Sequence, residues 1–207
     1  MKNYINVFIK PEGDGKIPVY ASKNAAGCDL YAAEDMVIRP GETKIIPLCF
    51  SMAFDENIEA QIRPRSGLSL KTELRIPNSP GTIDSDYRDA VGVIIQNIYN
   101  IANLPWQIAQ NPQILKELMT DYREVELKEY ISDYLKEENI SPDLDITRQK
   151  IYIDKNGNPY GTIYIKKGER IAQMVFCEYK KARFILHDNP RKIGNDRGGG
   201  FGHTGRE

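Results

Sequence analysis

The chain has 207 residues, which suits one domain with an elaboration and is long enough to bury a core without disulfide or metal support. Its 28 Lys and Arg residues against 29 Asp and Glu residues give a formal net charge of −1. This balance argues against a nucleic-acid coat or a membrane-surface protein, because such proteins are usually basic. A local phosphate site remains open, since it needs only a few well-placed cations.

The cysteines indicate a reducing compartment. Cys28, Cys49 and Cys177 are odd in number, far apart in the chain and without a CxxC pair, which argues against a zinc site or a disulfide framework. The N-terminal stretch lacks the shape of a signal peptide, and no run approaches the ~18 apolar residues of a membrane span. We therefore expect a cytoplasmic protein without a membrane partner.

The first half of the chain predicts strands. Short apolar runs from Tyr4 to Asn97 are separated by Gly, Pro, Asp and Asn, and their β-branched content favours strands over helices. The sequence RPGE at 39–42 is typical of a turn, with Pro at a favoured position. The close spacing of such turns predicts a β-sandwich or barrel.

The pattern changes to a helical one from Asn111 to Asn139. Apolar residues recur there at helical spacing, with a slip in phase near Val125 that predicts a kink or a break between two helices. Pro112 fits a helix start. The segment has four basic and eight acidic residues, which predicts an acidic exposed face with a net charge of −4.

The last third of the chain predicts strands and then a tail. The alternating stretches KIYID and YGTIYIKK flank NGN, which is typical of a β-hairpin with a Gly-containing loop. A further strand is expected from Arg170 to Tyr179. The C-terminal sequence NPRKIGNDRGGGFGHTGRE is rich in Gly and charge, so we expect it to stay mobile until a ligand orders it.

Four polar segments interrupt the β-rich pattern, and their chemistry favours a triphosphate site. They contain Asp29 beside Gly27, then PRSGLSLK, then PGTIDSDYRD, and finally the glycine-rich tail. A guanidinium and the backbone amides of a Gly-containing turn both bind phosphate oxygens. Carboxylates hold Mg²⁺ or orient an attacking water, and an aromatic side chain in a tail can stack on a base.

Each of these features alone has an ordinary explanation. A single Asp in a loop is as often a turn residue, and Arg65 alone is more often a surface cation. A glycine-rich terminus is usually only a tail. The chain has no Walker A motif, and RSGLS lacks both GxSxG and a clear His partner, so P-loop chemistry and acyl transfer are set aside.

Taken together and in order, the segments resemble the five motifs of trimeric dUTPases. The matching stretches are AGCDLYA at 26–32, PRSGLSLK at 64–71, NSPGTIDSDYRDAVGVIIQN at 78–97, KGERIAQMVF at 167–176 and RGGGFGHTG at 197–205. The resemblance implies a mainly β, jelly-roll-like fold (a β-clip) with an inserted α-helical and β-hairpin subdomain. We expect residues 1–98 and 161–187 to form the β core, 99–160 the insertion and 188–207 a flexible arm.

The resemblance also implies roles for single residues. Asp84 matches the carboxylate that activates the attacking water, and Asp29 matches the acid that faces a hydrated Mg²⁺. The substrate-binding matches are Arg65, Ser66, Gly67 and Gln173 for phosphates, Asn78, Gly81 and Ile83 for uracil and sugar, Tyr87 under the deoxyribose, Arg197 and Thr204 for the γ-phosphate, Phe201 as an aromatic lid, and Gly202 and His203 beside it.

The implied activity is hydrolysis of dUTP to dUMP and pyrophosphate by a homotrimer whose sites lie between subunits. Such an enzyme lowers dUTP and supplies dUMP for dTMP synthesis. Two alternatives stay open: an enzyme related to dCTP deaminase, and a non-catalytic regulatory binder that senses the nucleotide. Phe201 in the tail and the pair Asp84 and Tyr87 favour the first reading over the deaminase.

Two departures and the insertion distinguish this chain from the common pattern. Asp89 stands where the family usually has glycine, and His203 stands where serine is common. The insertion is either a surface elaboration on the β core or a partner-binding subdomain. Some phage dUTPases that resemble this chain carry an insertion here and bind a repressor. Exposed-aromatic candidates such as Trp106 and Tyr130 lead us to expect a protein partner for residues 99–160, rather than a nucleic acid.

Overall fold

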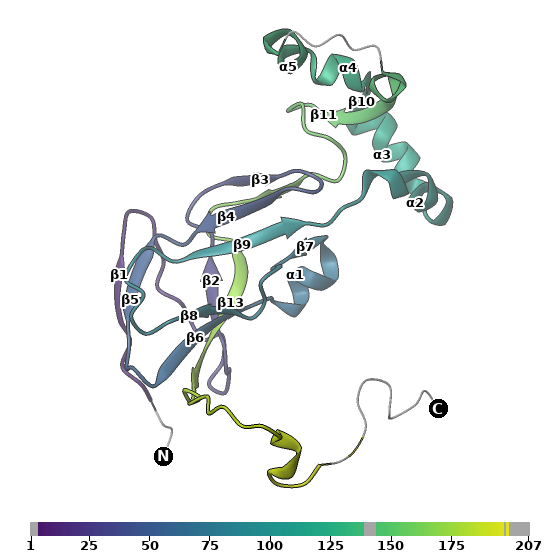
Figure 1. Ribbon diagram of the computed structural model, residues 1–207. Coiled ribbons are helices and arrows are strands. Elements are labelled where there is room, and N and C mark those ends of the chain that lie inside the picture. The colour runs from purple at the N-terminus through teal and green to yellow at the C-terminus, as the bar shows by residue number, and fades with distance from the viewer. Residues whose placement is uncertain (1–3, 139–143, 197, 199–207) are drawn as a thin grey trace.

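A computed structural model of the chain describes residues 4–138, 144–196 and 198. Figure 1 shows a body of strands, a segment with helices that projects from its upper right, and a C-terminal segment that extends away below it. In the described part of the chain, the strands pair in five antiparallel sheets.

Four of these sheets make the body. The largest has the order β2 (Cys28–Tyr31), β13 (Arg170–Glu178), β6 (Ile58–Arg63) and β8 (Gly81–Ile83). A second has the order β4 (Thr43–Pro47), β9 (Gly92–Asn97) and β7 (Leu74–Arg75). Two pairs complete the body: β1 (Phe8–Pro11) with β5 (Phe50–Ala53), and β3 (Met36–Ile38) with β12 (Ile163–Ile165).

The hydrophobic core lies between these sheets because alternate residues of each strand face inward. In β6 and β9 every second side chain is buried, as the period of a strand requires. The side chains that are at most 1% exposed include those of Leu30, Ile38, Phe50, Ile95 and Met174. The mainly β fold predicted from the sequence is confirmed.

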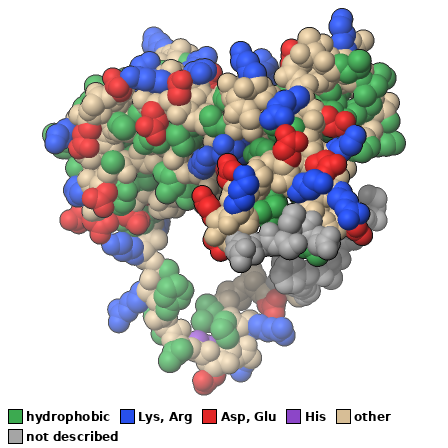
Figure 2. All heavy atoms as spheres, turned by 90° about the horizontal axis from the view of Figure 1, so that it is seen from above, with side chains coloured by type: hydrophobic (Ala, Val, Ile, Leu, Met, Phe, Trp, Pro, Cys, Tyr) green, Lys and Arg blue, Asp and Glu red, His purple; other side chains and the backbone are tan. Residues whose placement is uncertain are grey.

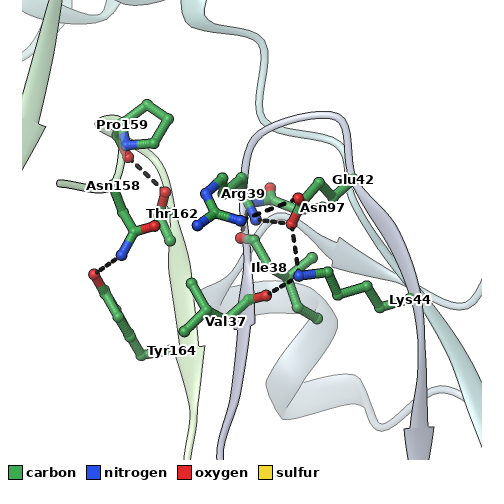
Figure 3. Close-up of polar contacts among 10 residues, drawn as sticks. All are labelled: Val37, Ile38, Arg39, Glu42, Lys44, Asn97, Asn158, Pro159, Thr162 and Tyr164. Carbon is green, nitrogen blue, oxygen red and sulfur yellow. Dashed lines mark hydrogen bonds and ion pairs between the residues drawn. The ribbon is translucent and has the colours of Figure 1, made fainter. Parts of the chain in front are cut away.

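The turn predicted at RPGE is also present. The amide of Glu42 donates to the carbonyl of Arg39 over 3.0 Å, and Gly41 takes a positive φ of 78° that favours glycine. The Glu42 carboxylate accepts from the Arg39 amide at 2.8 Å and pairs with Lys44 at 3.1 Å (Figure 3). These contacts close the turn between β3 and β4.

The projecting segment mixes short helices with a two-stranded sheet. It contains η1 (Ile101–Asn103), α2 (Leu104–Gln110), α3 (Gln113–Asp121), β10 (Tyr122–Glu126), α4 (Leu127–Tyr130), α5 (Ser132–Glu137), η2 (Asp145–Arg148) and β11 (Lys150–Asp154). The expected break between two helices near Val125 is present, because α3 ends at Asp121 and α4 begins at Leu127, but the residues between them are not helical. This stretch is the strand β10, where Val125 is 4% exposed and faces Ile151 of β11, so non-local pairing overrides the helical spacing.

The expected hairpin of KIYID with YGTIYIKK forms only in part, because the two strands have their main partners elsewhere. β11 pairs with β10, while β12 pairs with β3 in the body. An isolated bridge between Ile153 and Pro159, and the hydrogen bond from the Tyr160 amide to the Tyr152 carbonyl at 2.8 Å, link the two stretches over a few residues. Pro159 has no N–H for a ladder, and Gly161 turns the chain with a φ of 87°. The Thr162 hydroxyl donates to the Pro159 carbonyl at 2.6 Å and helps close this bend (Figure 3).

Asn97 fastens the projecting segment where it leaves and rejoins the body. Its side chain is fully buried, and its Nδ2 donates to the carbonyls of Ile38 at 3.0 Å and Gly161 at 2.9 Å. Its Oδ1 accepts the amide of Tyr99 at 3.0 Å. The Tyr99 ring lies over Gly161, where an added Cβ would come within 2.2 Å of it. A satisfied buried amide therefore holds both ends of the segment to the edge of β3.

Beyond β13 the chain extends away from the body (Figure 1). The strand predicted to Tyr179 ends at Glu178, and a short η3 (Pro190–Lys192) follows. Phe184, Ile185 and Leu186 are 95%, 78% and 102% exposed. None of the helices in the described ranges is long and apolar enough to cross a membrane.

Candidate functional site

Three neighbouring elements bring Asp29, Arg65 and Gln173 together. In the ladder, Asp29 on β2 lies opposite Gln173 on β13, and Gln173 in turn lies opposite Arg63, near the end of β6. Arg65 follows two residues later and precedes α1 (Ser66–Lys71). Most of the polar segment PRSGLSLK forms this short helix. Segments that are far apart in the sequence thus converge at one end of the largest sheet.

The Asp29 carboxylate lies between two guanidinium groups. Its Oδ1 accepts from Arg65 Nε at 2.9 Å and its Oδ2 accepts from Arg170 Nη1 at 3.2 Å. Arg65 Nη1 also donates to the carbonyl of Arg170 at 3.2 Å. Asp29 is 8% exposed, so its charge is buried, and the two ion pairs compensate it. The cluster as a whole carries one excess positive charge, which suits an anionic ligand.

The start of α1 adds amide donors beside these cations. Arg65 is in an extended conformation with φ −93° and ψ 130°, and the helix begins at Ser66. The first amides of a helix have no partner within it, and phosphate oxygens accept from such groups. No atom lies within 4 Å of where a Cβ of Gly67 would be, so the space over this turn is open.

Gln173 is held in place by its neighbours. Its Nε2 donates to the carbonyl of Pro64 at 2.9 Å. Its Oε1 lies 2.6 Å from the position of a Cβ on Gly27, so only glycine leaves the amide where it is. The bond to Pro64 thus orients Gln173 toward the turn that carries Arg65, and Gly27 leaves the room that this orientation needs.

A second group of predicted residues surrounds β8. Gly81 is buried opposite Ile62, and an added Cβ would lie 3.0 Å from Nδ2 of Asn78. The Asn78 amide therefore lies over Gly81, next to the cis peptide bond between Ser79 and Pro80. Ile83 ends the strand opposite Ala60 and packs partly against the core.

Asp84 and Tyr87 lie in the exposed turn that follows β8. The amide of Tyr87 donates to the Asp84 carbonyl at 3.1 Å, and the Tyr87 hydroxyl donates to the Ala90 carbonyl at 3.1 Å. Both side chains are exposed, and Tyr87 is 41% exposed. Asp89, where the family usually has glycine, is exposed in the same turn. The turn thus presents a carboxylate and a ring to solvent.

The Asp84 turn and Arg65 lie toward opposite ends of β6 in a single chain, whereas Gly81 lies opposite Ile62, near the end that leads to Arg65. Ile83 lies opposite Ala60, while Arg65 comes five residues later along the same extended stretch. At about 3.3 Å per residue this places Ile83 roughly 16 Å from Arg65, and the Asp84 turn follows Ile83 on the far side from Arg65. One copy of the chain therefore does not bring Asp84 to the Asp29 cluster by itself.

The tail residues cannot be placed in this arrangement. Arg197, Phe201, Gly202, His203 and Thr204 lie outside the described residues. Arg170, in contrast, was not assigned a role from the sequence. It belongs to the matched stretch KGERIAQMVF, and only the pairing of β13 with β2 reveals its contact with Asp29.

The chemistry of the cluster fits a metal that is carried by phosphates rather than one caged by protein. The described residues contain no group of three or more His, Cys, Asp or Glu side chains able to hold an ion. Asp29 is the carboxylate within the cationic cluster, and each of its oxygens already accepts one guanidinium bond. Each oxygen keeps a further lone pair, which fits a hydrogen bond from a metal-bound water better than direct ligation.

Comparison with known protein sequences points to one family. The dUTPase family model matches residues 14–131. A deoxyuridine 5'-triphosphate nucleotidohydrolase of Clostridium tetani is 50% identical over 84 residues, covering 41% of this chain and 58% of that protein. The protein of the same name from a strain of Wolbachia pipientis is 40% identical over 129 residues, covering 60% of this chain and 82% of that protein. The match thus spans less than two thirds of the C. tetani relative and more than two thirds of the Wolbachia one.

Solved structures agree in fold. The dUTPase of Staphylococcus bacteriophage 80alpha with dUpNHpp aligns with a TM-score of 0.67 at 22% identity, covering 97% of this chain and 99% of that one. The dUTPase of phage phi11 of S. aureus, described with its species-specific insert, aligns with a TM-score of 0.62 at 20% identity, covering 91% and 99%. The family match and the common fold lead to the same conclusion: this chain belongs to the dUTPase family.

Proposed function

We propose that the protein hydrolyses dUTP to dUMP and pyrophosphate. The observation that carries this proposal is the convergence of Asp29, Arg65 and Gln173 beside the start of α1. Two arginines on one buried carboxylate make a cationic cradle with amide donors at its edge, and a polyphosphate is the ligand that such a cradle favours. The relatives named as deoxyuridine 5'-triphosphate nucleotidohydrolases indicate which nucleotide to test first.

The site is complete only when a second copy supplies the turn after β8. In this proposal Arg65, Ser66, Gly67 and Gln173 of one copy hold the phosphates, and Asp84 of a neighbouring copy faces the α-phosphorus. The separation along β6 in one chain supports this division. A closed homotrimer satisfies it because each copy gives the same turn to the next.

The residues around β8 are proposed to read the nucleoside. Asn78, Gly81 and Ile83 form the pocket for uracil and sugar, and a hydrogen-bonding pocket rejects cytosine because the wrong base leaves buried partners unpaired. Tyr87 packs under the deoxyribose and leaves no room for a 2′-hydroxyl. In the tail, Arg197 and Thr204 are assigned to the γ-phosphate, and Phe201 closes over the base with Gly202 and His203 beside it.

Asp84 is assigned to the attacking water. Its exposed carboxylate stands free of ion pairs among the described residues, so it is available to accept a proton. Asp29 is proposed to orient the hydration shell of Mg²⁺ that arrives with the triphosphate. When bound, Mg²⁺ supplies neutralisation of the phosphate charge.

The test is a nucleotide panel with two readouts. We expect pyrophosphate release from dUTP in the presence of Mg²⁺, and little release from dCTP, dTTP or UTP. Ammonia release from dCTP would favour the deaminase reading instead. Tight dUTP binding without any turnover would favour the regulatory binder.

A second role in binding a regulatory protein is proposed for residues 99–160. Trp106 on α2 is 67% exposed, and Leu115 and Met119, one turn apart on α3, are 48% and 85% exposed. Figure 2 shows hydrophobic side chains gathered at the end of the molecule where α2 lies. Solved phage dUTPases of this fold are described as controlling transfer of virulence genes by a G protein-like mechanism. These observations favour a partner such as a repressor over a passive surface elaboration.

Deletion of the segment separates the two roles. Residues 100–158 are replaced by a short Gly linker, and dUTP hydrolysis and repressor capture are measured side by side. We expect hydrolysis to persist and capture to be lost. The double variant Trp106→Ala, Met119→Ala is the milder test, with Lys128→Ala elsewhere on the segment as its control. Unchanged capture by the deletion would refute the second role.

A further inference from the structure

Asp29 bonds two arginines, and the proposed function assigns a direct contact with the phosphates to only one of them. Arg65 belongs to the phosphate grip, while Arg170 has no assigned role. Arg170 lies at the start of β13 opposite Tyr31, just before the ladder shifts its register between Arg170 and Ala172. Such irregularities commonly redirect a side chain. Here the guanidinium lies against Oδ2 of Asp29.

The two arginines use different edges of the same carboxylate. Arg65 donates from Nε to Oδ1 and from Nη1 to the carbonyl of Arg170. Among the described residues no acceptor is bonded to Nη2 of Arg65. That end of the guanidinium therefore stays available for a phosphate oxygen.

Without Arg170, the free Oδ2 would compete for this end of Arg65. Arginine and carboxylate favour a bidentate pair with two parallel bonds. Asp29 is only 8% exposed, so a vacated Oδ2 would not be satisfied well by water. The nearest cation able to satisfy it is Arg65, whose second amino group would turn from the ligand toward Asp29.

We propose that Arg170 is a positioning residue of the phosphate grip: by occupying Oδ2 of Asp29, it keeps Arg65 singly paired and its Nη2 directed at the ligand. This inference rests on the proposed function, because it assumes that Arg65 binds the triphosphate. Arg170 acts through Arg65. Its side chain is 51% exposed, against 25% for Arg65.

The experiment compares Arg170→Gln with a matched variant, Arg39→Gln. Arg39 also pairs through Nη1 with a carboxylate, Glu42, at 3.3 Å, and it lies outside the site. The readouts are kcat and KM for dUTP, and the Kd for inorganic tripolyphosphate by calorimetry. We expect Arg170→Gln to raise KM and Kd about tenfold, the usual size of a charge-assisted bond, with kcat changed less than about threefold. Arg39→Gln should leave KM and Kd within about twofold of the wild type.

The dependence on Arg65 distinguishes positioning from a general structural effect. In an Arg65→Ala background, Arg170→Gln should raise KM and Kd by less than about a further twofold, because the group that it positions is gone. A tenfold rise in KM and Kd that Arg170→Gln still causes in this background would overturn the proposal. So would an unchanged KM and Kd in Arg170→Gln alone.

Two further measurements allow the proposal to be decided if a variant does not fold or dUTP is not hydrolysed. Arg170→Lys retains a cation for Oδ2 and should restore KM and Kd to within about threefold of the wild type. If Arg170→Gln does not fold, a Lys variant that binds as weakly as Arg65→Ala would overturn the proposal. If the wild type releases no pyrophosphate from dUTP, the proposed function fails by itself. The tripolyphosphate Kd then still decides the role of Arg170.

Discussion

The two halves of the proposed site are built in opposite ways. Around Asp29, charged side chains are held by each other and by three neighbouring elements, and the carboxylate is buried. Around Asp84, the side chains are exposed, and backbone hydrogen bonds of a turn set their positions. The Asp29 cluster, whose side chains hold one another, suits the binding of phosphates. The Asp84 turn has few contacts within its own chain and suits a surface that another copy covers.

The largest expected effect is on turnover, from the exposed half. Asp84→Ala should lower kcat by roughly 100-fold or more, because the carboxylate is assigned to the attacking water. Its stability should stay within about 0.5 kcal/mol of the wild type, since the side chain is exposed. Pyrophosphate release and thermal unfolding measure the two quantities. A wild-type rate would remove this role from Asp84.

Mixing two inactive variants tests whether the halves come from different copies. Asp84→Ala and Arg65→Ala are each unfolded, combined in equal amounts and refolded together. Random assembly pairs an intact phosphate half with an intact Asp84 turn in about a quarter of the sites, so roughly a quarter of the wild-type rate should return. Each variant refolded alone is the control. A mixture no more active than these controls would mean that one chain supplies both halves.

Much of the body could be predicted from the sequence because its signals are local. The alternation in β6, the alternation in β9 and the turn at 39–42 are each defined within a stretch of four to six residues. The strand β10 could not be predicted. Its residues continue the helical spacing of α3, and only pairing with β11, which comes much later in the chain, makes them a strand. In the same way, the pairing of β12 with β3 could not be predicted from the residues of β12 alone.

The site shows the same limit. Ordered motifs placed Asp29, Arg65 and Gln173 in one family pattern, and in the structure they meet. Arg170 was quoted within its motif without a role, because its contact with Asp29 depends on how β13 pairs with β2 around a shift in register. A sequence shows which residues follow one another along a strand. It does not show which residues of the neighbouring strand lie opposite them.

The buried half should cost stability when it is changed. Asp29→Asn leaves two guanidinium groups without their shared carboxylate, and we expect a loss of about 1–2 kcal/mol in the free energy of unfolding. This is below the usual cost for a fully buried pair, because Arg170 is half exposed and solvent screens its charge. Chemical denaturation checks the value, with Asp84→Asn as the exposed counterpart. Equal stability of the two variants would contradict the contrast between the halves.

The smallest expected effect is a change in affinity for dUTP without a change in stability, caused by moving one side chain of the buried half. Gly27→Ala places a Cβ 2.6 Å from Oε1 of Gln173, so the amide must move. The atom displaced is the far end of a flexible side chain, so unfolding should change by less than about 0.5 kcal/mol. The affinity for dUTP should nevertheless fall about threefold to tenfold, because one polar contact to the phosphates is misplaced. Gly67→Ala, whose Cβ would meet no protein atom within 4 Å, tests the open space of the site instead. If Gly27→Ala binds dUTP like the wild type, the orientation of Gln173 does not matter to the grip.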